Sequence, residues 1–297
     1  MNDLREKLMY KPKNGYDRLT AEDEQAMEAY CADYRKFLDN GKTERDCVDY
    51  TIELAQARGY VEYVPGMPLQ PGTKVYVNNR GKGIMLAVIG KKSLAEGANI
   101  GAAHTDAPRL DLKPNPLYEE SELAYLKTHH YGGVRKYQWV TVPLELRGVM
   151  VKGDGSVVKV CIGDKPEDPQ FVINDLLPHL GREQSKKPLG EAIPSETLNI
   201  LHEKYGVVEE DFISAELEAV PAACARELGF DRSLIGSYGH DDRVCAYAEL
   251  AALFDLDVPE KTAVCIFADK EEIGSDGVTG MKSEAFDWFM EQMCILK

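Results

Sequence analysis

The chain has 297 residues, of which 44% are hydrophobic and 29% are charged, and its formal net charge is -15. This composition is that of a globular protein, and the length fits one large domain or two modest ones. The negative charge argues against a nucleic-acid partner or an anionic membrane surface, because long-range repulsion would oppose the encounter.

Three features of the sequence bear on the cellular compartment. No apolar run approaches the ~20 residues that a membrane span requires. The first residues, MNDLREKLMYKPKNGYD, lack the apolar core of a signal peptide, which favours a cytoplasmic protein. The seven cysteines form no CxxC pair, so we expect reduced, mostly buried thiols.

The N-terminal third predicts two helices followed by strands. Thr20 precedes AEDEQ and is expected to cap a helix that ends at Gly41, and a second helix is expected from Thr43 to Gly59. TKVYVNN and GIMLAVIG predict two strands, and NIGAAHTD predicts a short buried strand that ends in polar residues.

The pattern changes between residues 108 and 236, where Pro and Gly are frequent and runs such as SVVKVCIG predict short strands. After Gly239, DDRVCAYAELAALFDL predicts a helix, TAVCIFAD a central strand and SEAFDWFMEQM another helix. We therefore predict an α/β domain formed by residues 1–107 and 237–297 and interrupted by a β-rich domain, residues 108–236.

The first of three polar clusters at the ends of apolar segments is AAHTDAP. Sites of α/β proteins gather at such strand ends. His104 and Asp106 are two positions apart and point the same way on an extended backbone, so that the histidine could bind a metal while the carboxylate orients it. The commoner explanation of so short a motif is a strand-end histidine beside a surface aspartate.

The other two clusters are acidic pairs. Asp241 and Asp242 begin a predicted helix, where the helix dipole favours carboxylates, but one of them could instead bridge two metal ions ~3.5–4 Å apart. Glu271 and Glu272 follow a predicted strand, and neighbours on an extended segment point to opposite sides. One could bind a metal and the other act as general base, and a solvated loop is the alternative.

Together the clusters offer one imidazole and several carboxylates, which suit zinc, manganese or cobalt better than a thiolate site would. The chain contains no GxGxxG, GxxxxGK[ST], HExxH or GxSxG motif. Cys245 and Cys265 lie in apolar runs, so we expect them in the core and not as nucleophiles.

Four motifs occur in a fixed order: AAHTDAPRLDLKPNP, YGGVRKYQWVTVPLELRGVMVKGDG, GHDDR and DKEEIGSDGVTG. In combination they resemble the aspartyl-aminopeptidase type of cytosolic metallo-aminopeptidase, from about residue 20 onward. GHDDR alone is also similar to the related glutamyl-aminopeptidases. The resemblance implies a phosphorylase/hydrolase-like α/β peptidase domain, interrupted by a β-rich dimerisation domain. It also implies a pair of divalent ions, usually zinc, release of N-terminal residues from peptide substrates, and a homo-oligomer in which dimers assemble to a dodecamer.

The resemblance also implies a role for each motif residue. His104 matches a metal ligand, and Asp106 matches the carboxylate that supports it. Asp241 matches the ligand that bridges the two ions. Glu271 matches the general base, and Glu272 matches a further metal ligand.

Two further points concern histidines. His179, in LLPHLG, resembles an insertion-domain histidine that reaches the substrate in a neighbouring subunit's site. The family completes its site with an aspartate and a histidine beyond the second glutamate, but no histidine of this chain follows Glu272 and the chain ends at Lys297. We therefore expect an N-terminal portion of such an enzyme, with a peptidase domain and a metal pair that are incomplete.

Three functions remain as hypotheses. The first is a metallo-aminopeptidase with Glu271 as general base. The second is a catalytically inactive truncated subunit or scaffold that keeps the dimerisation domain, motivated by the missing ligands. The third is another two-metal hydrolase, such as a phosphoesterase, which would need basic residues near the phosphate; only Arg109 and Arg243 lie beside the acidic clusters.

Overall fold

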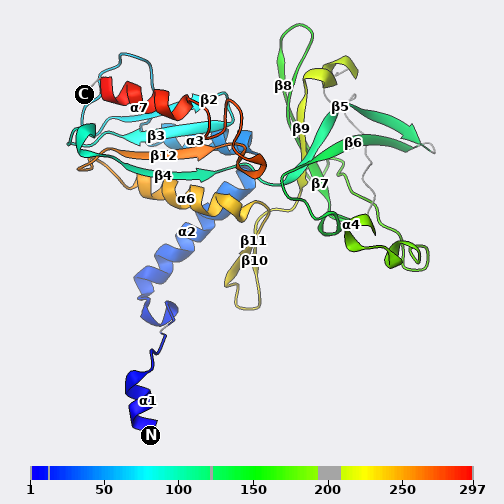
Figure 1. Ribbon diagram of the computed structural model, residues 1–297, viewed down its shortest axis with the longest axis horizontal. Helices are drawn as coiled ribbons and strands as arrows, with labels where there is room; N and C mark the ends of the chain where they lie inside the picture. The colour runs from blue at the N-terminus through cyan, green and yellow to red at the C-terminus, as the bar shows by residue number, and fades with distance from the viewer. Residues whose placement is uncertain (1, 13, 121–122, 193–208, 296–297) are drawn as a thin grey trace.

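The structure is a computed structural model that describes residues 2–12, 14–120, 123–192 and 209–295. Figure 1 shows two lobes side by side, each built on its own five-stranded sheet. We call the lobe that carries the first sheet the α/β lobe and the lobe that carries the second the β-rich lobe. This architecture confirms the predicted fold class.

The sheet of the α/β lobe has the strand order β1-β2-β3-β12-β4. Its strands are β1 Val61–Glu62, β2 Lys74–Asn79, β3 Gly83–Val88, β12 Ala263–Ala268 and β4 Asn99–His104. The prediction that TAVCIFAD forms a central strand is confirmed, because β12 lies antiparallel to β3 on one side and parallel to β4 on the other.

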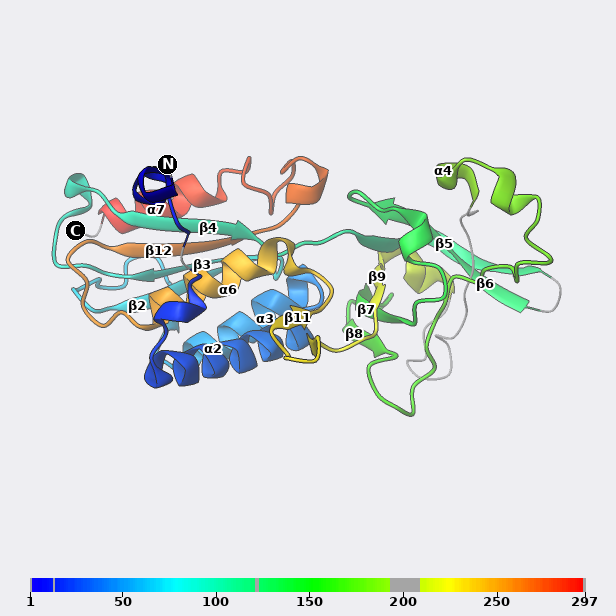
Figure 2. The same ribbon diagram turned by 90° about the horizontal axis from the view of Figure 1, so that it is seen from below.

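Helices cover both faces of this sheet, with α2, α3 and α6 on one face and α7 on the other (Figure 2). The helices are α1 Asn2–Leu8, α2 Ala21–Asn40, α3 Glu44–Gln56, α6 His240–Phe254 and α7 Ala285–Ile295. Thr20 caps α2 as predicted: its hydroxyl accepts from the Asp23 amide at 3.1 Å, and the Asp23 carboxylate accepts from the Thr20 amide at 2.9 Å. The second helix ends at Gln56, before Gly59.

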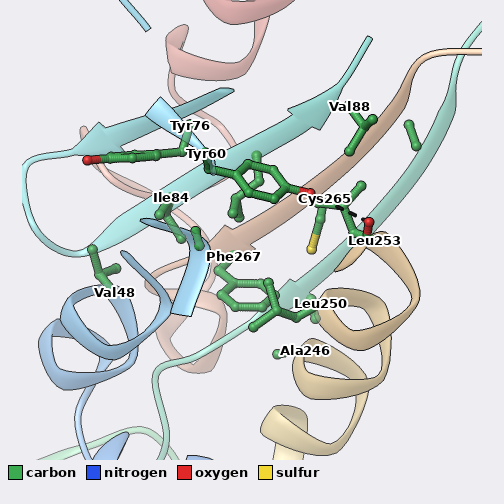
Figure 3. Close-up of a cluster of buried hydrophobic side chains, with 14 of the residues drawn as sticks. Val48, Tyr60, Tyr76, Ile84, Val88, Ala246, Leu250, Leu253, Cys265 and Phe267 are labelled. Carbon is green, nitrogen blue, oxygen red and sulfur yellow. Dashed lines mark hydrogen bonds between the residues drawn. The ribbon is translucent and has the colours of Figure 1, made fainter. Parts of the chain in front are cut away.

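Two apolar layers hold the helices to the sheet. Phe267 of β12 and Leu250 of α6 are buried in the layer that faces α2, α3 and α6 (Figure 3). Phe289 and Met293 of α7 are buried against the opposite face of the sheet. The central strands β3 and β12 are therefore covered on both faces, which explains why they are apolar and buried at every position.

The sheet of the β-rich lobe has the order β6-β5-β9-β7-β8, and all its neighbouring pairs are antiparallel. Its strands are β5 Arg109–Glu120, β6 Leu123–Tyr131, β7 Leu144–Val151, β8 Val157–Ile162 and β9 Glu216–Pro221. Two smaller features are the short helix α4 Leu189–Ala192 and the hairpin of β10 Arg226–Leu228 with β11 Leu234–Gly236. The domain boundaries at residues 108 and 236 stay a prediction.

The two lobes meet through buried charges. The Arg109 guanidinium of β5 lies 3.1 Å from Glu44 of α3, and Glu44 also lies 2.8 Å from the Lys82 ammonium. Lys42 of the α/β lobe lies 3.2 Å from Glu145 of β7. All five side chains are buried. Because a buried charge is costly without a partner, these pairs fix how one lobe sits against the other.

Glu218 of β9 gives a pH-dependent prediction. Burial, followed by the charge of Glu44, raises the pKa of Glu218 well above its usual range, although Arg109 lowers it. The folded chain therefore keeps a proton that the unfolded chain releases above its usual pKa of about 4.5, so this group costs stability as pH rises. We expect Glu218→Gln to raise the urea midpoint above that of wild type, and we expect this increase in midpoint to be larger at pH 8 than at pH 5.

Glu216 provides the matched control on the same strand. Hydrogen bonds from Arg45 and Lys82 lower the pKa of Glu216, although burial opposes them. This carboxylate stabilises the fold above its usual pKa and loses that contribution as pH falls. Glu216→Gln should therefore lower the urea midpoint at pH 8. Equal gains for Glu218→Gln at both pH values would contradict the first prediction.

The prediction that most of the thiols are buried is wrong. All seven cysteines lie within the described residues and none is in a disulfide, but only Cys47 and Cys265 are buried. Cys245 is exposed, because the buried face of α6 carries Arg243, Ala246 and Leu250. In the described part of the chain, no helix is long and apolar enough to cross a membrane.

Candidate metal centre

The predicted site residues lie where β4, β12 and α6 end or begin. The parallel register of β12 and β4 places Ala268 beside His104, so the carboxyl ends of the two strands meet. The turn Glu271–Ile273 (η6) follows β12, and α6 begins at His240. The structure thus brings together segments that are more than 100 residues apart in sequence, which is the usual location of a site in an α/β protein.

His104 faces two carboxylates. Its Nε2 lies 3.4 Å from Asp241 Oδ1 and 3.7 Å from Glu271 Oε2, and its side chain is 10% exposed. Its Nδ1 donates to the backbone carbonyl of Asp106 at 2.9 Å. Burial disfavours the charged imidazole, but the hydrogen bonds to Asp106 and the charge of that carboxylate outweigh burial and raise the pKa of His104 to about 9.

Asp106 is fully buried, which excludes the surface aspartate that the motif alone allowed. Its carboxylate accepts from Tyr131 Oη at 2.8 Å and from the amides of Glu271 and Glu272, each at 3.2 Å. Burial opposes ionisation, but the hydrogen bonds from His104 and Tyr131 outweigh it and lower the pKa of Asp106. Asp106 therefore joins the strand end that carries His104 to the turn that carries both glutamates.

The geometric reason given for separating the two glutamates is wrong. Lys270 is in the left-handed region (φ 68°), and the chain turns there, so Glu271 and Glu272 lie in a 3-10 turn and not on an extended segment. They nevertheless differ in surroundings. Glu271 is 59% exposed and faces His104, whereas burial, with neighbouring acids, raises the pKa of Glu272.

The start of α6 carries the acidic pair. Asp241 is 89% exposed, and both Asp241 and Asp242 depart from helical φ/ψ. The peptide bond that joins them is cis. His240 is engaged elsewhere, because its two ring nitrogens lie 2.9 Å from Tyr34 Oη and 3.1 Å from the carbonyl of Ile235. Asp241 is thus the residue of this segment that faces His104.

Arg243 supports this segment from beneath, and the sequence did not indicate it. The side chain is fully buried, and Nη2 donates to the carbonyls of Lys42 and Thr105, each at 3.0 Å. Thr105 lies between His104 and Asp106, so Arg243 joins α6 to the end of β4. Gly239 is required here, because it has φ 76° and a Cβ would lie 1.6 Å from Arg243 Nη1. The supporting role of Arg243 follows from its hydrogen bonds to Lys42 and Thr105, which sequence spacing does not report.

The other histidines that the structure describes lie outside this group. His179 lies exposed in a turn of the β-rich lobe, and His129 and His130 are exposed at the end of β6. His202 lies outside the described residues. The insertion-domain role of His179 therefore stays a prediction.

The side chains of this site are of the chemical types that bind divalent metal ions. An imidazole nitrogen and carboxylates are ligands of zinc, cobalt and manganese, and Asp106 fixes the ring so that Nε2 faces Asp241. Among the described residues, however, no group of three or more His, Cys, Asp or Glu side chains is arranged so that it could hold a metal ion. The side chains of Asp241 and Glu271 are 89% and 59% exposed.

Comparisons with known proteins agree with the motifs. The family model described as Aminopeptidase I zinc metalloprotease (M18) matches residues 37–193 and 183–297. A probable M18 family aminopeptidase 1 of Clostridium acetobutylicum is 45% identical over 309 residues, which cover 94% of this chain and 66% of the relative. The chain thus spans about two thirds of the length of this curated relative.

Solved structures share the fold. The M18-family aminopeptidase from Thermotoga maritima superposes with a TM-score of 0.89 at 41% identity, over 97% of this chain and 67% of that one. The yeast mApe1 dodecamer has a TM-score of 0.72 at 18% identity, over 91% of this chain and 67% of that one, which shows the fold alone. The resemblance that the four motifs indicated is therefore confirmed: this chain belongs to the M18 peptidase family of aminopeptidase I zinc metalloproteases.

Proposed function

We propose that this chain carries the site of a metallo-aminopeptidase, which releases N-terminal amino acids from peptides by the attack of water on the peptide carbonyl. The observation that carries the proposal is the position of His104, whose Nε2 faces Asp241 and Glu271 while Asp106 holds its Nδ1 side. Membership of the M18 family supports the same reaction class.

In this proposal His104, Asp241 and Glu272 would hold the metal, with zinc as the ion that the family description names. Cobalt and manganese suit the same donors. Bound there, such ions lower the pKa of water and polarise the scissile carbonyl. The burial of Asp106 and its three hydrogen-bond donors fix the ligand His104 without placing a second charge in contact with solvent.

Glu271 is the proposed general base. Its carboxylate lies beside His104 and remains open to solvent, where a water and a peptide can reach it. It accepts the proton of the attacking water and returns it to the leaving amine as the peptide bond breaks. The Glu271 amide donates to Asp106, so the same buried carboxylate positions both the ligand and the base.

The proposal extends to a homo-oligomer. His179 is exposed, and three of its neighbours in sequence, Leu176, Leu177 and Leu180, are exposed as well. An apolar segment of this kind favours burial against another surface, and the structural relative from yeast is described as a dodecamer. We propose that this segment of the β-rich lobe meets another subunit and that His179 reaches the substrate in that subunit's site.

The alternatives receive unequal support. The scaffold hypothesis keeps the motivation that the sequence supplied, namely that no histidine of this sequence follows Glu272 to complete the site as in the family. The phosphoesterase hypothesis loses its two basic residues, because Arg109 and Arg243 are buried. Arg109 is paired with Glu44, Asp111 and Glu218, and neither guanidinium is exposed to a phosphate.

Metal analysis tests the proposal directly. We expect the purified chain to bind zinc through the ligands that it carries, His104, Asp241 and Glu272, and to release the N-terminal residue from aminoacyl-p-nitroanilides. We expect His104→Ala to weaken zinc binding by more than the 10–100-fold that loss of an outer-shell partner typically costs. The matched control is His129→Ala, at an exposed position of β6, which should bind zinc like wild type. A wild-type chain that binds no zinc, cobalt or manganese and releases no amino acid would favour the scaffold.

A further inference from the structure

A tyrosine of the β-rich lobe reaches into the candidate metal centre. Tyr131 is the last residue of β6, and its side chain is buried. Its hydroxyl donates to Asp106 Oδ2 at 2.8 Å, across the boundary between the lobes. Burial, followed by the charge of Asp106, raises the pKa of the Tyr131 phenol, so the hydroxyl keeps its proton and remains a donor.

The ring of Tyr131 is fixed independently of its hydroxyl. The Arg109 guanidinium lies over the ring at 3.7 Å from the centroid. Arg109 is itself held by Glu44 of the α/β lobe at 3.1 Å and by Glu218 of the β-rich lobe at 3.0 Å. Side chains of both lobes therefore set the position from which Tyr131 reaches Asp106, and a stacked guanidinium favours one ring orientation.

The residue after Tyr131 contacts the site through its backbone. Gly132 has φ 70°, and a Cβ at this position would lie 3.0 Å from Glu272 Oε2 and 3.1 Å from Glu272 Cβ. A side chain here would be strained and would displace the carboxylate of Glu272. A Cβ added to the next residue, Gly133, would have no atom within 4 Å, and the φ of Gly133 lies outside the left-handed range. Only the first glycine of the YGGV motif is therefore constrained by the site.

We propose that Tyr131 and Gly132 are positioning residues of the metal centre, supplied by the β-rich lobe. Tyr131 holds the Asp106 carboxylate in the orientation that receives the Glu271 and Glu272 amides and supports His104. Gly132, which has no side chain, leaves room for the carboxylate of Glu272 beside the segment that follows β6. This inference rests on the proposed function for its metal, but the hydrogen-bonded arrangement that it describes exists without one.

Two matched pairs of variants test the metal part. Tyr131→Phe removes the hydroxyl and keeps the stacked ring, and its control, Tyr76→Phe, removes a buried hydroxyl that accepts from Gln56 Nε2 at 2.9 Å on β2 (Figure 3). Gly132→Ala is compared with Gly133→Ala. We expect Tyr131→Phe and Gly132→Ala to weaken zinc binding, measured by competition with a chromogenic chelator, by about 10–100-fold. The bound-cobalt absorption bands should shift in these two variants, and both controls should match wild type.

A second measurement needs no metal. The Glu271 and Glu272 amides donate to Asp106, so loss of the Tyr131 hydroxyl should speed hydrogen–deuterium exchange in peptides that cover residues 269–277. Tyr76→Phe should leave this exchange unchanged. Equal exchange in the two variants would overturn the role of Tyr131, whatever the metal data show. If wild type bound no metal, the proposed function would fail, and exchange would still decide whether Tyr131 orders this turn.

Discussion

The Glu271→Gln variant is expected to lose about 10²–10⁴-fold in turnover while it binds zinc as wild type does. The amide keeps the size of the side chain but cannot accept a proton from water. Glu271 is the more exposed of the two glutamates and faces His104. The hydrogen bond to Asp106 comes from the backbone amide of Glu271, so the substitution leaves it in place. Turnover of aminoacyl-p-nitroanilides and zinc content of the same preparation measure the two effects separately.

The comparison with Glu291→Gln controls for the loss of one negative charge. Glu291 lies exposed on α7, and its change should leave turnover and zinc content unaltered. If Glu271→Gln retained turnover within tenfold of wild type, Glu271 would not be the base. If it lost zinc as well, Glu271 would be a ligand instead, and the roles of Glu271 and Glu272 would be exchanged.

Arg109→Met should destabilise the chain by about 3–5 kcal/mol, because it removes the buried guanidinium that pairs with Glu44 and contacts Glu218, and leaves the buried Glu44 with Lys82 as its remaining partner. The chain has two tryptophans, Trp139 in the β-rich lobe and Trp288 in α7. Urea unfolding followed by fluorescence in single-tryptophan backgrounds reports on each lobe. Since Arg109 contacts side chains of both lobes, we expect the urea midpoints that the two tryptophans report to fall together.

Arg232→Met is the matched control. Its guanidinium lies 3.5 Å from Glu227 and is 78% exposed, so its loss should cost no more than about 1 kcal/mol. If Arg109→Met also cost less than about 1 kcal/mol, the buried pairs would not determine how the lobes associate. Adding Glu218→Gln to Arg109→Met should recover part of the loss at pH 8, since the glutamine removes a buried carboxyl that costs more to ionise once Arg109 is gone.

Several features could be predicted from sequence because they depend on local pattern. The unbroken apolar run of β12 is typical of a strand with neighbours on both sides, and Thr20 with Asp23 is a capping box that defines the start of α2. His104 and Asp106 were paired correctly, because two residues at that spacing share a side wherever the backbone is extended.

Other features depend on contacts that spacing does not report. The left-handed conformation of Lys270 turned the EEIG segment out of the extended form, so alternation gave no valid reason to separate Glu271 from Glu272. Tyr131 stands in a motif that helped to identify the family, but its bond to Asp106 exists only once the two lobes are docked. Cys245 is apolar in its sequence context and exposed in the fold, since α6 buries a different face.

The positions of His104 and Asp241 also bear on the order in which the molecule is made. The chain leaves the first sheet just after His104 and returns to the α/β lobe with α6, just before Asp241, so the strands of the second sheet are synthesised between the two. Glu271 and Glu272 follow later still, after β12 has inserted between β3 and β4. Since a ribosome releases its product from the N-terminus onward, Tyr131 is available to Asp106 before either glutamate has been translated. In a growing chain, the β-rich lobe can therefore prepare the histidine side of the centre in advance, and the two glutamates are added later by the turn that follows β12.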